Sequence, residues 1–214
     1  MATGSRTKNR AARAERARAT RWRIIAAATE LFIRDGYLQT TMADIARQAE
    51  VAVQTLYLSF GSKVAVLTAA LDAAIAGDDQ PLPVLERPWF ARLRAEPDPV
   101  AALDIVADNA TEIIDRVYPL YAAVINASAD PELAEVRDRN KQQRFASHQP
   151  VMQELAGRPG FNQQLPVERA TDIFYTLMSE ETYGLLVAEH GWSVPDWSRW
   201  ARRHIRAELF PGTP

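Results

Sequence analysis

Apolar residues recur at spacings of three and four along most of the chain, which is the pattern of helices that each bury one face. In the first such helix, which begins near Trp22, the apolar positions are Ile24, Ile25, Ala28, Leu31 and Phe32. Gly36 follows this stripe as a helix-ending residue. No stretch of useful length alternates apolar and polar residues as a half-buried strand would. The pattern predicts an all-α fold.

Two short helices separated by about three residues follow the first helix. One begins at Thr41, which forms a capping pair with Asp44 three residues later. After a break at residues 50–52, the other runs from Val53 to Phe60, and Ser62 can cap a further helix. Two short helices packed on a longer first one are the helix-turn-helix arrangement, so we expect a three-helix domain of this type.

Composition divides the chain into four parts. Residues 1–19 are polar and basic, which predicts a disordered arm or a frayed helix. Residues 20–76 form the helix-turn-helix domain, and residues 77–98, rich in Pro and Asp, form a linker in which Trp89, Phe90 and Leu93 build a short docking helix. Residues 99–214 form a second helical domain. Its expected helices span 99–117, 119–128, 131–156, 166–190 and 195–210, with Pro119, Pro131, Pro166 and Pro195 near helix starts.

Charge is distributed unevenly along the chain. Residues 1–64 contain 11 Lys and Arg against 5 Asp and Glu, whereas the remainder has 14 basic and 22 acidic residues. The first part therefore has a charge of +6 and the second of −8. A basic head on an acidic body suits a protein of which one end approaches a polyanion; an unbound basic tail is the alternative.

Several function classes lack support in the sequence. The chain has no cysteine, which excludes disulfides and thiolate sites. It has neither a run of 18 apolar residues nor an apolar segment after the basic start, so we expect no membrane span and a cytoplasmic location. His148, His190 and His204 are far apart, and adjacent Glu180 and Glu181 should point in different directions. We therefore expect no enzyme, no cofactor and no metal.

The segment from Thr40 to Lys63 resembles the DNA-binding signature of the tetracycline-repressor (TetR-like) family. It reads TTMADIA, then VAVQTLYLSFGSK from Val51 onward, and the tight resemblance extends from Ile25 to Leu71. Two positions depart from the family pattern. Glu50 replaces the usual turn Gly, which costs about 1 kcal/mol if φ is positive there. Ala52 replaces a Ser helix cap, a loss of about 0.5–2 kcal/mol.

Physical chemistry and the resemblance together suggest which residues contact DNA. The second short helix must bury one face and present the other to the major groove, where Gln54 can pair with an adenine edge and Val53 can touch a thymine methyl. The resemblance assigns base contacts also to Ser59 and phosphate contacts to Tyr57 and Lys63. The complete set of expected DNA-binding residues is Arg21, Arg23, Thr41, Val53, Gln54, Thr55, Tyr57, Ser59 and Lys63.

The second domain carries aromatic and soft apolar residues on helical stripes. Ordinary core packing accounts for most of them, but the resemblance implies an effector pocket among these helices. Because few full charges fall on the stripes, we expect a small apolar or aromatic ligand. The candidate ligand-binding residues are Asn109, Tyr118, Tyr121, Phe145, Phe174 and Met178.

The resemblance further implies a homodimer through helices 166–190 and 195–210. The function expected is a repressor that a small-molecule effector releases from its double-stranded DNA operator. Two alternatives stay open: an architectural DNA-binding protein without an effector, and a helical small-molecule-binding protein that does not bind DNA. A salt-sensitive gel shift separates the last from the other two.

Overall fold

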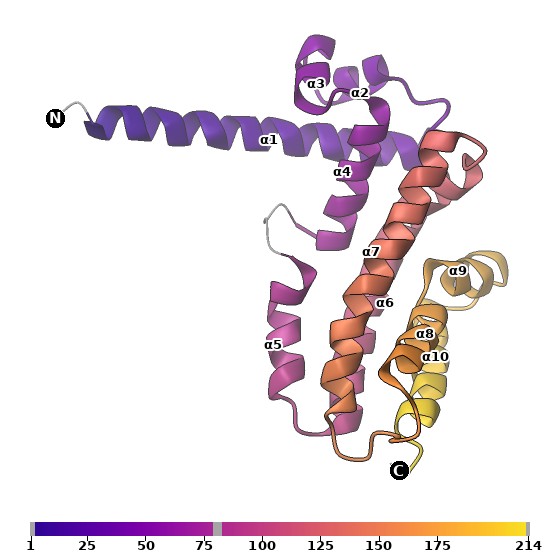
Figure 1. Ribbon diagram of the computed structural model, residues 1–214. Coiled ribbons are helices and arrows are strands. Elements are labelled where there is room, and N and C mark those ends of the chain that lie inside the picture. Colours follow the sequence, from indigo (N-terminus) through magenta and orange to yellow (C-terminus); the bar gives the residue numbers. More distant parts are fainter. Residues whose placement is uncertain (1–2, 79–82, 213–214) are drawn as a thin grey trace. The chain divides into compact units, whose positions relative to one another are not determined.

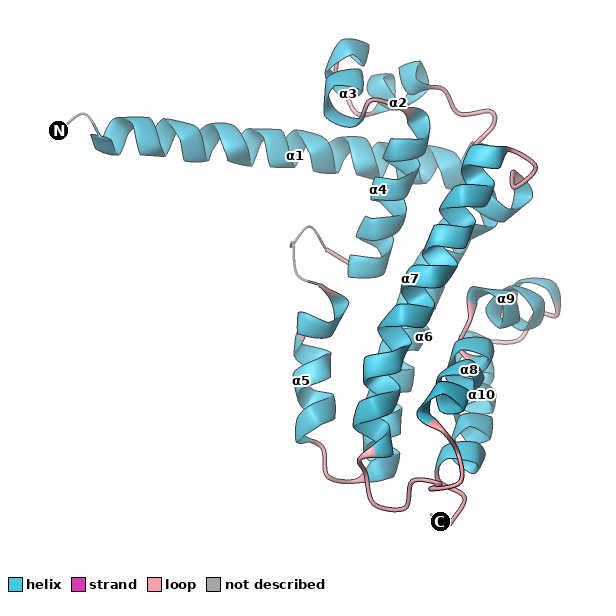
Figure 2. Ribbon diagram, in the orientation of Figure 1, coloured by secondary structure: helices cyan, strands magenta, loops and turns pink. Residues whose placement is uncertain are grey.

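A computed structural model describes residues 3–78 and 83–212, and within these ranges it contains helices and no strand (Figure 2). The all-α prediction is confirmed. Contacts within the chain divide it into two compact units, Met1–Ala73 and Ala74–Pro214.

The described part of the first unit contains α1 (Thr3–Asp35), α2 (Met42–Gln48), α3 (Val53–Phe60) and most of α4 (Lys63–Ala76), whose last three residues fall past the boundary at Ala73 (Figure 1). Helix α2 packs against both α1 and α3. The predicted apolar stripes supply the core. Its buried side chains include Ile24, Ala28, Phe32, Ile45, Leu56, Val66 and Leu67.

Helix α1 is longer than the apolar pattern predicts, because residues 3–19 continue it at its N-terminal end. This segment is rich in Ala and Arg, which are among the strongest helix formers. Arg18 also pairs with Glu15 at 3.1 Å, one turn apart on the exposed surface. The arm is therefore helical where the structure describes it, and residues 1–2 of the expected arm lie outside the described residues.

The predicted helix ends agree with the structure. Gly36 ends α1 with a positive φ of 81°. Thr41 caps α2 through a complete capping box, in which its side chain accepts the amide of Asp44 and the Asp44 carboxylate accepts the amide of Thr41. Ser62 accepts the amide of Ala65 at the start of α4.

The second unit places two long helices side by side and packs shorter ones on them. Helix α7 lies against α6, α8 lies against α7, and α10 contacts both α6 and α8 (Figure 1). The elements are the 3₁₀ turn η1 (Val84–Glu86), α5 (Pro88–Ala95), α6 (Pro99–Asn126), α7 (Pro131–Ala156), α8 (Val167–Leu177), α9 (Glu180–Tyr183), the π-helix η2 (Gly184–Glu189) and α10 (Val194–Leu209). Their shared core includes Leu93, Leu103, Met152, Phe174 and Trp197.

Two predicted boundaries in this unit are wrong. Pro119 lies inside α6 rather than at the start of a new helix. A proline there removes one backbone hydrogen bond, but Val117, Leu120 and Tyr121 around it are buried, and their packing holds the helix together. The helix expected over 166–190 is interrupted after Met178, whose ψ of 72° is not helical.

Residues 83–98 of the expected linker belong to the second unit and contain the expected short helix. In α5, Trp89, Phe90 and Leu93 are all buried, and the Trp89 indole donates to the carbonyl of Val84 at 2.9 Å. Residues 79–82 of the expected linker lie outside the described residues.

Within the described ranges, no single helix combines the length and the apolar composition needed to cross a membrane; only α3 and α4 taken together meet that test, and they are bent by 70°.

Candidate functional site

The turn between α2 and α3 is a Schellman motif centred on Glu50. The amide of Val51 donates to the carbonyl of Ala46 at 3.0 Å, and the amide of Glu50 donates to that of Arg47 at 3.2 Å. Such a turn needs a left-handed residue, and Glu50 adopts it with φ 54°. It is the single non-glycine residue with positive φ among the described residues. The strain predicted from sequence is therefore present.

Helix α3 begins without a side-chain cap, because Ala52 has the extended backbone of a cap residue but no oxygen to accept an amide. Of its eight residues, all of which the structure describes, Leu56 alone is buried. Val53, Tyr57 and Leu58 are 40%, 50% and 82% exposed. A helix with one anchoring residue leaves nearly its whole circumference available to a partner.

The expected base-reading residues are exposed on this helix. Gln54, Thr55 and Ser59 are all exposed. The hydroxyl of Ser59 donates to the carbonyl of Thr55 at 2.8 Å, so its proton is already used inside the helix, whereas its oxygen can still accept. Gln54 has the amide group that can pair with a base edge in two places.

Arg21 and Arg23 project from α1 and are both exposed. The Arg21 guanidinium donates to the carbonyl of Ser59 at 3.3 Å and lies 4.2 Å from the centre of the Phe60 ring. It therefore fastens the C-terminal end of α3 to α1, where a cation is also favoured by the helix dipole. Its remaining donors face solvent beside the exposed helix.

Thr41 and Lys63 use their polar groups in bonds within the first unit. The Thr41 hydroxyl donates to Asp44 at 2.6 Å within the capping box. The Lys63 ammonium donates to the carbonyls of Tyr37 and Thr40 at 2.8 and 2.9 Å and lies 4.1 Å from the Tyr37 ring centre. Both residues thus position the segment before α2 and the start of α4.

In the second unit, three of the candidate ligand-binding residues lie around the middle of α7. Phe174 meets the edge of His148 at 4.9 Å between ring centres, and Phe145, which is 39% exposed, meets the edge of Tyr175 at 5.4 Å. The fully buried Tyr121 points its hydroxyl at Glu181, 3.5 Å away.

The other three candidates are placed differently. Tyr118 packs on Tyr183 at 4.8 Å, next to this group, and Met178 is fully buried at the end of α8. Asn109 is half-buried on α6, twelve residues before Tyr121, which is about 18 Å along the helix axis. The structure therefore does not bring Asn109 together with the aromatic residues.

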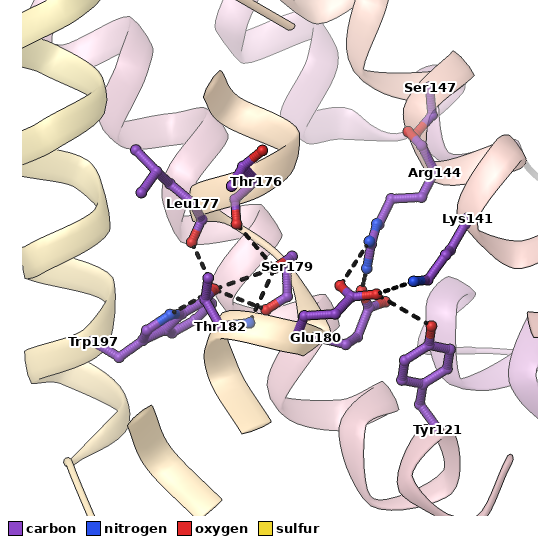
Figure 3. A network of polar contacts seen from close by, with 11 residues as sticks. Tyr121, Lys141, Arg144, Ser147, Thr176, Leu177, Ser179, Glu180, Thr182 and Trp197 are labelled. Atoms are coloured by element: carbon purple, nitrogen blue, oxygen red, sulfur yellow. Dashed lines mark hydrogen bonds and ion pairs between the residues drawn. The ribbon is translucent and has the colours of Figure 1, made fainter. Parts of the chain in front are cut away.

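Sequence reasoning missed a charged cluster at the centre of this unit. Arg144 forms ion pairs with both Glu180 and Glu181, and Lys141 reaches Glu181 at 2.8 Å (Figure 3). The Arg144 and Glu180 side chains are only 10% and 5% exposed. The two adjacent glutamates, expected to diverge, converge on one guanidinium. The one sign of this cluster in the sequence is that a charged residue, Arg144, occupies a position of α7 where the apolar stripe would place an apolar residue.

These charges shift the ionisation of their neighbours. Burial raises the pKa of the Glu181 carboxyl, but the Lys141 hydrogen bond and the Arg144 charge outweigh it and bring the pKa to about 2. Burial, with the Arg144 charge, lowers the pKa of His148 to about 3. His148 is therefore neutral at physiological pH.

The break between α8 and α9 is a fixed feature of the same region (Figure 3). Ser179 caps α9 by accepting the amide of Thr182 at 3.1 Å and donates to the carbonyl of Thr176 at 2.9 Å. The Thr182 hydroxyl in turn accepts the Trp197 indole of α10 at 3.3 Å. This network sets the direction in which Glu180 and Glu181 leave the backbone.

Comparison with known proteins gives a match in the first unit. Residues 24–70 match the family model described as bacterial regulatory proteins, tetR family. The HTH-type transcriptional regulator HbdR of Aromatoleum sp. (strain CIB) is 40% identical over 63 residues, which is 29% of this chain and 28% of that relative.

Solved structures share the whole fold at low identity. The NalD repressor of the MexAB-OprM multidrug efflux pump in Pseudomonas aeruginosa matches with a TM-score of 0.67 at 17% identity, over 91% of this chain and 98% of that one. The transcriptional regulator FadR of Bacillus subtilis, solved with stearoyl-CoA, matches with a TM-score of 0.66 at 18% identity, over 87% and 98%. At such identities the likeness concerns the fold.

Proposed function

We propose that this chain, which through residues 24–70 is a TetR-like regulator of the tetR family of bacterial regulatory proteins, is a homodimeric repressor of transcription. It binds an operator through α3 and releases it when a small molecule binds in the second unit. The proposal includes no catalytic step, and it places the protein in the cytoplasm with the DNA.

The observation that carries the proposal is the exposure of α3 on a basic unit. A helix of eight residues with Leu56 as its single buried residue is a poor packing element but a suitable reading element for the major groove. Gln54 faces an adenine edge, Val53 a thymine methyl, and Ser59 accepts from a base. Thr55, Tyr57, Arg23 and the free donors of Arg21 contact phosphates.

We assign Thr41 and Lys63 an indirect part in DNA binding. Their polar groups are already bonded to Asp44 and to the carbonyls of Tyr37 and Thr40, so they orient the ends of α2 and α4 beside the groove. The ammonium of Lys63 can add a phosphate contact only from this position. We therefore expect Lys63 to support DNA affinity mainly by positioning the start of α4, and less by its charge.

The dimer would form through α8, α9 and α10. Much of the apolar surface of α10 is used inside the unit, since Trp197, Ile205 and Leu209 are fully buried. Exposed apolar residues lie just before α10, namely Leu185 on η2 and Trp192 in the segment that follows it, which are 48% and 37% exposed. Two copies joined by such a face present two α3 helices to successive major grooves about 34 Å apart.

A gel-shift experiment tests the DNA part. Fragments selected from genomic DNA should shift with a strong dependence on salt, because phosphate contacts release counterions. The Gln54→Ala variant should lose preference at one base pair per half-site, whereas Tyr57→Phe should weaken all sequences alike. A chain that shifts no DNA at low salt would instead be a helical binding protein without a DNA function.

Sedimentation tests the dimer. Trp192→Glu should shift the full-length protein toward the monomer, because it places a charge in the apolar contact. Glu112→Gln, which also changes the charge by one unit but on the exposed side of α6, is the matched control and should leave the mass unchanged. A dimer that resists Trp192→Glu would contradict the assigned face.

A further inference from the structure

The buried face of α7 changes character along its length. Leu133 and Val136 are buried near its start, and Val151, Met152 and Leu155 near its end, as in an ordinary core helix.

Between these apolar ends stand Asn140, Arg144 and His148, each four residues after the last. This spacing places them on one face of the helix in three successive turns. We call these three residues the polar stripe.

Each residue of the polar stripe has a buried polar atom without a partner. Among the described residues, Asn140 Oδ1, Arg144 Nε and His148 Nδ1 make no hydrogen bond. Asn140 is 8% exposed as a whole residue. Buried polar groups in native proteins are nearly always bonded, so three orphaned atoms in a row indicate a place built for polar groups from elsewhere.

The charges around the stripe are balanced before any ligand arrives. Arg144 and Lys141 oppose Glu180 and Glu181. The two glutamates differ in freedom, because the Glu180 side chain is 5% exposed and that of Glu181 is 40% exposed. Because it is partly exposed, the Glu181 carboxylate can turn into water and be solvated there, whereas Glu180 and Arg144 cannot.

We propose that Arg144 and His148 of the polar stripe bind the carboxylate of an effector with an aromatic body, and that this carboxylate takes the Nε–Nη2 edge of Arg144 from Glu181. The inference rests on the proposed function only in calling the ligand an effector. Nε is unpartnered and Nη2 now holds Glu181 at 3.0 Å, so the two nitrogens form the edge that binds a carboxylate in a bidentate way.

The alternatives fit less well. A cation would have to displace the buried Arg144 from two glutamates, and a neutral ligand would leave the guanidinium edge with a weaker partner than it already has. A carboxylate preserves the charge balance, because it replaces one carboxylate by another.

The surroundings suit an aromatic body. The guanidinium of Arg144 lies 4.4 Å from the centre of the Tyr175 ring, on which Phe145 packs, and Phe174 packs on His148. Neutral His148 can donate from Nδ1 to a second ligand oxygen. Three of the predicted ligand residues, Phe145, Phe174 and Tyr121, thus keep their role, with Arg144 added as the anchor.

The exchange would also reach the helices proposed to form the dimer. Glu181 belongs to α9, which Ser179 and Thr182 tie to α8 and, through the Trp197 indole, to α10. When Glu181 leaves Arg144 and Lys141, α9 loses two of its ion pairs with α7 and keeps the Glu180–Arg144 pair, while its bonds to α10 are unchanged. The ligand would therefore change the packing of α9 and α10 against α7.

The test measures binding of benzoate and of its uncharged counterpart benzamide to the full-length protein by calorimetry, without DNA. Wild type should bind benzoate at least about tenfold more tightly than benzamide. Glu181→Gln, which removes most of the competing charge, should tighten benzoate about tenfold and leave benzamide unchanged. Arg144→Lys, which keeps the charge but lacks the guanidinium edge, should abolish the preference.

A glutamate elsewhere on α7 provides the control. Glu154→Gln breaks a surface ion pair with Arg94 and should change neither affinity. Equal binding of benzoate and benzamide, or a Glu181→Gln variant with wild-type benzoate affinity, would overturn the inference. Gel shifts on the same samples separate the two proposals. A protein that binds DNA but does not prefer benzoate would contradict this inference alone. A protein that prefers benzoate but does not bind DNA would contradict the proposed function alone.

Discussion

Glu50 offers a direct test of how the helix-turn-helix is held. Its left-handed backbone, φ 54°, disfavours a residue with a Cβ by about 1–2 kcal/mol. Glycine removes that strain but loses more conformational freedom on folding, about 0.5–1 kcal/mol. Glu50→Gly should therefore stabilise the turn by about 0.5–1 kcal/mol.

A second variant separates strain from charge. Glu50→Ala removes the same carboxylate but keeps the Cβ, so it should leave the turn as strained as in wild type. Both variants should tighten DNA binding equally at low salt, because both remove one negative charge beside the proposed DNA surface. The difference between Gly and Ala thus isolates the backbone.

Hydrogen exchange of amides in α2 and α3 is the suitable assay, because it reports local opening within the full-length chain. The expected stabilisation corresponds to exchange about two- to fivefold slower in Glu50→Gly than in Glu50→Ala. The amide of Val51, which closes the Schellman motif on Ala46, should respond most. Identical exchange in the two variants would refute the reasoning that φ at this position limits stability.

Three further predictions concern other parts of the molecule. Gln54→Ala should relax base preference by about 1–3 kcal/mol at one position per half-site in a binding selection, and an unchanged preferred sequence would remove Gln54 from the reading set. Gly184→Ala should lower the free energy of unfolding by about 1–3 kcal/mol, because the added Cβ would stand 2.8 Å from the Tyr118 hydroxyl. Gly157→Ala is the control, since its Cβ would stand 3.6 Å from the nearest atom, the Glu154 carbonyl oxygen. Equal urea midpoints for the two variants would argue against the clash. The pKa of His148 is about 3 in the folded state and about 6.5 in the unfolded state, so the unfolded state binds a proton first as the pH falls. The free energy of unfolding should therefore decrease between pH 6.5 and pH 3, by at most about 1.4 kcal/mol per pH unit. His148→Gln should flatten this pH dependence in urea titrations.

Features set by neighbouring residues were predictable from the sequence. The capping box of Thr41, the cap of Ser62 and the left-handed end at Gly36 each depend on residues within four positions. The strained turn at Glu50 was predictable for the same reason. Local hydrogen bonds and local backbone preferences decide these features, and the sequence states them directly.

Features set by distant packing were not predictable in the same way. Pro119 is a helix breaker by local preference, yet buried neighbours carry α6 through it. The break after Met178 contains neither Gly nor Pro; its one local sign is Ser179 followed by two acidic residues, a combination typical of a helix start. The pairing of Arg144 with Glu180 joins residues 36 positions apart, which no local pattern reveals.

The buried charges of the second unit also raise the question of why they are there. Replacing a buried ion pair with apolar residues is often neutral or stabilising by about 1–4 kcal/mol, whereas removing one partner destabilises by about 3–5 kcal/mol. Arg144→Met should therefore lower the free energy of unfolding by several kcal/mol, because Glu180, 5% exposed, is left unpaired.

Adding Glu180→Leu to Arg144→Met should restore stability to the wild-type value or above it, as read from urea midpoints by circular dichroism. Glu181 keeps its bond to Lys141 in that double variant, so no further charge is orphaned. If the double variant is as stable as wild type but no longer distinguishes benzoate from benzamide, the charges serve recognition and not folding. A double variant no more stable than Arg144→Met would show that the pair is needed to hold α7 against α9, and the argument from orphaned atoms would lose its basis.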